Sequence, residues 1–274
     1  KMLNIRYISG VIAFILVVAI LTLGCASASI EISVGSIQDQ VSPDQHVEYE
    51  INVTASNDSS AKDFVAGIFG FGQSLDGSYV ELKADQDKSP YSARTYLELD
   101  SKDLRLEPGE TKKLILEGDI PSDVGDGGRY AIVSIRPPAP KASKGVSVSM
   151  GIDIPVILSI KDTEMAKTGE ISKIELDAPI LAEQQNLSLI FANTGNIHYR
   201  AIAKADLKDK DGNVLTSAST KPSFSSIIPS NSLLIKLVLS PEEKLESGDY
   251  SIASEVSTED GEILATKDIS FKIE

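Results

Sequence analysis

The 274-residue sequence is long enough for two domains of ordinary size, each able to bury its own core. Its 40 acidic and 26 basic residues give a formal net charge of −14, which excludes nucleic acid as a partner because phosphates would be repelled. The single cysteine excludes a framework of disulfides, so we expect core packing alone to hold the fold.

Residues 1–28 predict a signal peptide or membrane anchor that is not part of the folded domains. Lys1 and Arg6 precede an apolar run from Val11 to Leu23, and the small residues of "CASAS" fit cleavage after Ala28. We therefore expect an exported protein that works outside the cell or at the cell surface.

Two alternatives for this segment stay open. The stretch "LTLGC" is similar to a lipobox, which would leave Cys25 as a lipidated N-terminus. If the segment is not cut, the stretch from Tyr7 to Cys25 is just long enough to span a bilayer, with the tyrosine at the interface. Either alternative predicts attachment to a membrane through the N-terminus.

A motif occurs twice in the chain. Laying Pro108 on Pro229 aligns "PGETKKLILEGDIPSDVGDGGRYAIV" with "PSNSLLIKLVLSPEEKLESGDYSIA". The residues that coincide are Pro121 and Pro241, Gly128 and Gly248, Tyr130 and Tyr250, and Ile132 and Ile252. We interpret the repeat as two copies of one domain.

Both copies have the pattern of strands joined by turns. Apolar residues alternate with polar ones in "HVEYEINVTASND" and "NLSLIFANTGN", which predicts the second strand of each copy. The stretches "LKDKDGNVL" and "STEDGEILATKDISFKI" predict hairpins with Asp-Gly turns. No strong helical period follows residue 30, so the predicted fold class is all-β.

The position of the repeated tyrosines predicts the type of β-sandwich. Tyr130 and Tyr250 each open a strand after a proline and a turn, as in the tyrosine corner of immunoglobulin-like domains. Ile132 and Ile252 stand where antibody domains have a disulfide cysteine, so we expect apolar packing in place of the bridge. We predict two tandem immunoglobulin-like β-sandwich domains, at 30–160 and 171–274, after an N-terminal signal or anchor helix.

The first copy has extra residues, which we place in an inserted hairpin region within "GFGQSLDGSYVELKADQDKSPYSARTYLELD". An extension on a rigid sandwich is a common place for binding. Within it, Tyr91, Arg94 and Tyr96 combine rings with a guanidinium, as binding surfaces often do. The proline-rich basic loop "RPPAPKASKG" adds three further candidates, Arg136, Lys141 and Lys144, which we predict to attract an anionic wall polymer.

Several of these stretches resemble a known group of proteins. "GFGQSLDGSYVELKADQDKSPYSARTYLEL", "LEPGETKKLILEGDIPSDVGDGGRYAIVSIRP", "FANTGNIHYRA" and "SGDYSI" are similar to exported prokaryotic surface proteins with tandem immunoglobulin-like domains, akin to the WxL-interacting proteins. The resemblance implies a non-enzymatic envelope protein. It also implies a first domain associated with peptidoglycan and a second domain associated with a host or partner surface.

The sequence shows little that would support catalysis. The two histidines, His46 and His198, are expected at a strand start and in an exposed turn, and no cysteine remains after cleavage to bind zinc or act as a nucleophile. "DKDGN" matches only the first half of a calcium loop and predicts a hairpin turn. We therefore expect neither an enzyme, nor a cofactor, nor a bound metal.

Our main interpretation is a non-catalytic envelope interaction protein that binds wall polymer or a surface protein through loops and edge strands. One alternative is a carbohydrate-binding module, although the chain has no tryptophan and only 5% aromatic residues for stacking on sugars. Another is a secretion-assembly factor that accepts a partner strand as pilus chaperones do. Asn52, Asn57 and Asn186 head N-x-Ser/Thr sequons, at which an exported chain can be glycosylated.

Overall fold

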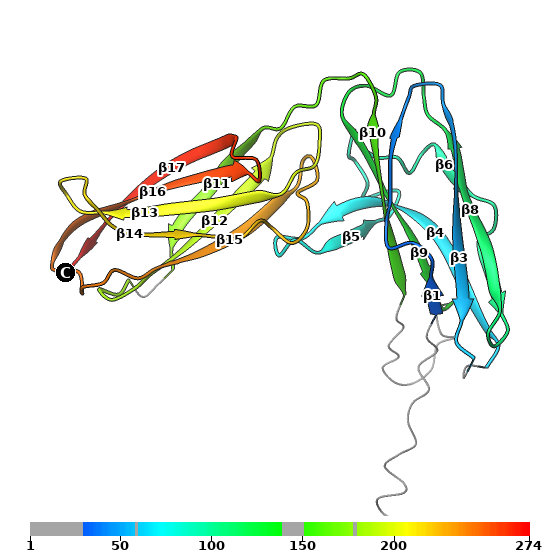
Figure 1. Ribbon diagram of the computed structural model, residues 1–274, viewed down its shortest axis with the longest axis horizontal. Helices are drawn as coiled ribbons and strands as arrows, with labels where there is room; N and C mark the ends of the chain where they lie inside the picture. The colour runs from blue at the N-terminus through cyan, green and yellow to red at the C-terminus, as the bar shows by residue number, and fades with distance from the viewer. Residues whose placement is uncertain (1–29, 58–59, 139–150, 178–179) are drawn as a thin grey trace, which may run out of the picture.

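The structure is a computed structural model that describes residues 30–57, 60–138, 151–177 and 180–274 (Figure 1). Every regular element in these ranges is a β-strand, which confirms the prediction of an all-β chain. None of the described residues forms a helix long and apolar enough to cross a membrane. The predicted signal or anchor segment lies outside the described residues, and so do Cys25, Lys141 and Lys144.

Residues 30–160 form two sheets, which we call the first sandwich. One sheet has the order β1 (Ile30–Ile32), β3 (His46–Ala55), β8 (Thr111–Asp119), β6 (Leu97–Leu99). The other has the order β2 (Ile37–Val41), β10 (Ile152–Ile160), β9 (Gly128–Arg136), β4 (Lys62–Gln73), β5 (Tyr79–Leu82), and β7 (Asp103–Leu106) also pairs with β4.

The core of the first sandwich lies between its sheets. Ile51 of β3 and Leu114 of β8 are fully buried and share one cluster with Val133 and Ile135 of β9 and with Val156 of β10. Because side chains alternate between the two faces of a strand, every second residue of these strands enters the core. The period-two pattern in the sequence follows from this geometry.

Residues 169–273 form two further sheets, the second sandwich. One has the order β11 (Gly169–Leu176), β12 (Gln185–Asn193), β15 (Ser232–Leu239). The other has the order β14 (Val214–Ser219), β13 (Ala201–Lys208), β16 (Gly248–Thr258), β17 (Ile263–Ile273). Phe191, Leu189, Leu207, Ile252 and Val256 lie in the buried cluster between these sheets.

The two sandwiches share one strand order. The order β1-β3-β8 in the first is matched by β11-β12-β15 in the second, and β10-β9-β4-β5 is matched by β17-β16-β13-β14. The predicted second strands of the two copies are β3 and β12, which occupy equivalent central positions. The repeated motif in the sequence therefore corresponds to a repeated arrangement of strands.

Both predicted Asp-Gly hairpins are confirmed. Gly212 and Gly261 have φ of 86° and 89°, a left-handed conformation that glycine adopts without steric cost. In the first of these turns the Asp209 carboxylate accepts hydrogen bonds from the backbone N–H groups of Asp211 and Asn213, each at 2.9 Å. The "DKDGN" stretch is thus a hairpin turn between β13 and β14, closed by its own aspartate.

The tyrosine-corner prediction is right for Tyr250 and wrong for Tyr130. The Tyr250 hydroxyl donates to the carbonyl oxygen of Glu246, four residues upstream, at 2.9 Å. Tyr130 and Ile132 instead lie on the face of β9 that points away from the first core, which takes Val133 from this strand. A shift of one residue moves every side chain of a strand to the other face. At this strand the sequence alignment of the two copies is therefore one residue out of register with their structures.

β4 changes its partner part-way along its length. It pairs with β9 as far as Phe69 and with β5 from Gly70 onward. Residues 91–93 occupy the position beside β9 that β4 leaves: the Tyr130 N–H donates to the Tyr91 carbonyl, and the Ala93 N–H donates to the Tyr130 carbonyl, both at 2.8 Å. The β4–β5 hairpin therefore projects from the first sandwich toward the second (Figure 1).

The point where β4 leaves β9 yields a prediction about Gly70. A Cβ at this position would overlap the side chain of Asp87, which is buried and paired with Arg94. We expect Gly70→Ala to lower the free energy of unfolding by about 1–3 kcal/mol, the usual cost of overpacking. Urea unfolding of the variant measures this, with Gly35→Ala as the control because a Cβ at Gly35 meets nothing within 4 Å. Equal stability of the two variants would show that β4 does not pass this closely over Asp87.

Candidate functional site

The tip of the β4–β5 hairpin is fixed to the second sandwich by the amide side chain of Gln73. Its Nε2 donates to the carbonyl of Ser226 at 3.0 Å, and its Oε1 accepts from the N–H of Ile228 at 3.2 Å. The Gln73 backbone N–H donates to Oδ1 of Asn231 at 3.1 Å. One residue of the inserted hairpin region thus makes three hydrogen bonds to the loop that precedes β15.

The hairpin also reaches the edge of a sheet in the second sandwich. The N–H of Leu234, on β15, donates to the carbonyl of Leu75 at 2.7 Å. Among the strands that the structure describes, β15 is an edge strand that pairs with β12 alone. The hairpin therefore covers the beginning of an edge that continues beyond it.

A second contact between the sandwiches comes from Tyr130, whose side chain is 1% exposed. Its hydroxyl oxygen accepts a hydrogen bond from the backbone N–H of His198 at 2.9 Å and lies 3.1 Å from Nδ1 of the same residue. Nearby, the N–H of Gly128 donates to the carbonyl of Asn196 at 2.8 Å. His198 was expected in an exposed turn, but its imidazole is part of this contact.

A small apolar cluster fills the junction beside these hydrogen bonds. Phe71, Tyr130, Ile132 and Ile157 of the first sandwich are buried in it together with Ile228 of the second. The rings of Phe71 and Tyr130 meet edge to face, with centroids 6.1 Å apart. The two sandwiches are therefore joined by a packed interface as well as by the linker between β10 and β11.

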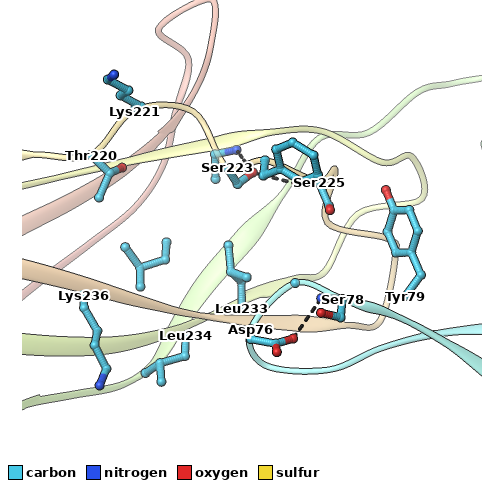
Figure 2. A pocket seen from close by; sticks show the side chains of 14 residues that line it. Asp76, Ser78, Tyr79, Thr220, Lys221, Ser223, Ser225, Leu233, Leu234 and Lys236 are labelled. Atoms are coloured by element: carbon cyan, nitrogen blue, oxygen red, sulfur yellow. Dashed lines mark hydrogen bonds between the residues drawn. The ribbon is translucent and has the colours of Figure 1, made fainter. Parts of the chain in front are cut away.

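An apolar pocket of about 530 Å³ lies between the hairpin and the second sandwich (Figure 2). It is lined by hairpin residues 76–79, by residues between 220 and 225 and by β15 residues 233–236, together with Ala201. Phe224, which also lines it, is 100% exposed. A fully exposed phenylalanine beside an apolar pocket is a feature of binding surfaces.

Of the charged groups that line the pocket, the carboxylate has hydrogen-bond partners and the two lysines have no ion-pair partner among the described residues. The carboxylate of Asp76 accepts from the hydroxyl of Ser74 at 2.5 Å and from the N–H of Ser78 at 2.9 Å, and these hydrogen bonds lower its pKa. Lys221 and Lys236 are exposed, and neither forms an ion pair among the described residues. The pocket therefore presents unpaired positive charge on a chain of net charge −14.

The β15 edge is open between the hairpin and Ser240, whose carbonyl accepts a hydrogen bond from the hydroxyl of Thr216 on β14 at 3.2 Å. Successive residues of a strand direct their backbone N–H and C=O groups to opposite sides, and the N–H of Leu234 points to the hairpin. The backbone N–H and C=O groups of Lys236 and Val238 must therefore point the same way as those of Leu234, away from β12. Among the described residues, no backbone hydrogen bond outside the strand ladders reaches Lys236 or Val238. These two residues offer unpaired donors and acceptors next to the pocket.

The predicted binding residues of the inserted region make internal contacts. Arg94 donates through Nε to Oδ2 of the buried Asp87 at 3.2 Å. The ring of Tyr91 lies under the guanidinium of Arg129, at 5.7 Å from the centroid. Tyr96 packs against the first core. Their binding role stays a prediction.

The other predicted residues that lie within the described ranges are Arg136 and the three sequon asparagines. Arg136 forms ion pairs with Glu81 and Asp153, and its guanidinium lies 5.6 Å from the Phe69 ring centroid. Of the sequon residues, Asn57 is exposed, whereas Asn52 and Asn186 are half-buried on β3 and β12. Their glycosylation stays a prediction.

One group of metal-ligand type is present among the described residues. His46, Glu48 and Glu117 place their ligand atoms within 4.8 Å of one another on the outer surface of β3 and β8. Nδ1 of His46 lies 2.8 Å from Oδ1 of Asp119, and this hydrogen bond raises the pKa of the histidine. Since the group is largely solvated and Asp119 already holds the histidine, we assign it no metal.

Comparison with known proteins gives distant structural matches only. No protein-family model and no curated protein sequence matches the chain. A chaperone–tip adhesin complex of CFA/I fimbriae biogenesis has a TM-score of 0.45 and 11% identity, over 89% of this chain and 98% of that chain. The class 5 fimbriae chaperone CfaA has a TM-score of 0.44 and 12% identity over the same shares. The CsuC–CsuE chaperone–tip subunit complex of Acinetobacter baumannii has 0.40 and 13%, over 76% and 90%. At these values the matches assign the chain neither a family nor an activity.

The different roles of the two repeated tyrosines predict different effects of the same substitution. Tyr130→Phe leaves the buried N–H of His198 without its acceptor, so we expect a loss of about 1–3 kcal/mol in the free energy of unfolding. Tyr250→Phe removes only a donor to an exposed carbonyl, and we expect a loss of about 0.5 kcal/mol. Urea unfolding of both variants measures the difference. If Tyr250→Phe were the more damaging change, Tyr130 would not be the one that joins the sandwiches.

The junction also predicts a dependence on pH. Burial lowers the pKa of His198 below its usual value. As the pH falls below about 6.5, the unfolded chain takes up a proton at this histidine more readily than the folded chain does, so the stability that is complete above that pH is progressively lost. We expect wild type to lose more stability between pH 7 and pH 5 than His198→Asn, whose side-chain oxygen keeps an acceptor near Tyr130.

Thermal unfolding of the two proteins across this range measures the effect. His46→Asn is the control, because the pKa of His46 is raised by Asp119 and its stabilisation is lost as the pH rises, in the opposite direction. Identical pH profiles for wild type and His198→Asn would contradict the buried, neutral state of His198.

Proposed function

We propose that this chain is an exported, non-enzymatic assembly factor of the cell envelope that binds another protein by accepting an extended segment at the open edge of β15. The observation that carries the proposal is the pair of unpaired backbone positions at Lys236 and Val238, next to an apolar pocket. A segment that adds a strand to a sheet edge gains main-chain hydrogen bonds from the edge and specificity from side-chain pockets. In this chain the unpaired backbone groups of β15 lie next to the apolar pocket.

The architecture supports this role. We propose that both sandwiches are immunoglobulin-like, since each has the three-strand order of strands A, B and E facing the order G, F, C, C′. Exposed edge strands are normally short, charged or covered, because they invite pairing with other chains. The hairpin covers only the first part of the β15 edge, which is consistent with a place kept open for a partner.

The sequence features outside the described residues fit the same proposal. An export signal in residues 1–28 would bring the protein to the envelope, where its partner would be a surface protein. Two of the distantly similar solved structures are chaperones in complex with a tip subunit, which is the class of partner proposed here. The support comes from the edge strand of this chain, and binding of wall polymer stays a prediction.

Proline at Val238 tests the open edge. The N–H of Val238 points away from β12, so proline is tolerated by the ladder of its own sheet but removes a donor that an added strand would use. We expect the full-length Val238→Pro protein to stay folded and to bind peptides selected from a displayed library of extended eight-residue sequences at least about tenfold more weakly than wild type, the equivalent of about 1.4 kcal/mol.

Val238→Thr is the matched control, because it keeps the N–H and a β-branched side chain of similar shape. Fluorescence polarisation measures binding, and circular dichroism checks that each variant folds. Binding by Val238→Pro that equals binding by Val238→Thr, or the absence of any peptide that binds wild type, would contradict strand addition at β15.

A further inference from the structure

Resting on the proposed function, we infer that the β15 edge selects a protein segment in which an apolar residue is followed directly by an acidic one. The apolar side chain enters the pocket between the hairpin and β15, and the carboxylate faces Lys236 on the outer surface. The alternation of side chains along β15 determines which guest residue enters the pocket and which one faces Lys236.

β15 has one buried face and one exposed face. Ile235 and Leu237 are buried and face the interior of the second sandwich, whereas Lys236 and Val238 are exposed on the outside. Directly opposite residues on paired strands project to the same face of the sheet. A guest residue opposite Ile235 therefore points inward, and the next guest residue, opposite Lys236, points outward.

The inward guest residue meets the pocket. The pocket of about 530 Å³ opens beside β15 residues 233–236, where Figure 2 shows Leu233 and Leu234 across from Ser223 and Ser225. Leu233, Tyr79 and the fully exposed Phe224 provide apolar lining. A leucine or an aromatic side chain placed here would be removed from water together with the Phe224 ring, which favours an apolar guest residue.

The outward guest residue meets positive charge. Lys236 is exposed on the outer face of β15 and has no ion-pair partner among the described residues, whereas Lys221 lies across the pocket, next to Thr220, whose N–H donates to Ala203 of β13. Asp76, the one carboxylate of the pocket, is directed to the hydroxyl of Ser74 and the N–H of Ser78 within its own turn, as the dashed line in Figure 2 marks for Ser78. Opposite charges directly across a strand pair attract and like charges repel, so an acidic guest residue is preferred over a basic one.

The occupant is a segment of another protein, on grounds of charge and continuity. The hairpin already places the Leu75 carbonyl against the Leu234 N–H, so a guest strand would extend an existing intramolecular contact along the same edge. The chain as a whole is acidic, with a net charge of −14, which opposes general association with other acidic chains. Attraction of an acidic segment is therefore local to Lys236 and depends on correct register.

The test uses three synthetic eight-residue peptides and the full-length protein. One peptide carries adjacent Leu and Glu flanked by threonine and valine, the second has Lys in place of Glu, and the third has Ser in place of Leu. We expect the Leu-Glu peptide to bind wild type about fivefold more tightly than either relative. Lys236→Glu should reverse the preference between the Glu and Lys peptides, whereas Lys210→Glu, on the turn between β13 and β14, should leave it unchanged.

The outcomes separate this inference from the proposed function. If all three peptides bind equally, Lys236→Glu has no effect and Val238→Pro abolishes binding, the edge accepts a strand but the apolar-acidic preference is wrong. If Val238→Pro leaves peptide binding unchanged, or if no peptide binds, the proposed function fails as well. If wild type forms a dimer that Lys236→Glu dissociates, the occupant is a second copy of this chain and the inference of a separate acidic partner is overturned.

Discussion

After Phe69, β4 leaves β9 and pairs with β5. The hairpin that these two strands form makes the hydrogen bonds that hold the second sandwich in place. Gln73 reaches the loop before β15, and the Leu75 carbonyl accepts a hydrogen bond from the N–H of Leu234 on the β15 edge. Gly70 permits the close passage over Asp87. The same hairpin forms one wall of the pocket, so a single irregularity in one sheet positions both the neighbouring sandwich and the candidate binding site.

Features that depend on neighbouring residues in the chain were predicted well. Strands β3 and β12 follow from alternating apolar residues, and the turns at Gly212 and Gly261 follow from Asp-Gly pairs that favour left-handed glycine. The Tyr250 hydrogen bond to Glu246 spans only four residues. Such patterns can be read from one stretch of sequence because the physical cause lies within that stretch.

Features that depend on contacts between distant residues were missed. Gln73 and Asn231 lie 158 positions apart, and nothing in either local sequence indicates that they meet. The repeated motif also gave a wrong prediction for Tyr130. Tyr130 and Tyr250 align in the sequence, but Tyr130 points away from the core of its sandwich, whereas Tyr250 packs against the core of its own. Tyr91 and Arg94, which the sequence predicts as binding residues, make contacts within the first sandwich instead. The open edge is defined by backbone N–H and C=O groups, which every sequence contains, so no residue type indicates it.

Amide hydrogen exchange along β15, followed by NMR on the unliganded protein, tests the open edge most directly. The N–H groups of Ile235 and Leu237 are paired with β12 and that of Leu234 with the hairpin, so all three should exchange slowly. Those of Lys236 and Val238 point to solvent and should exchange fast. Slow exchange at Lys236 and Val238, as slow as at their neighbours, would show that the edge is already occupied and would contradict the binding site.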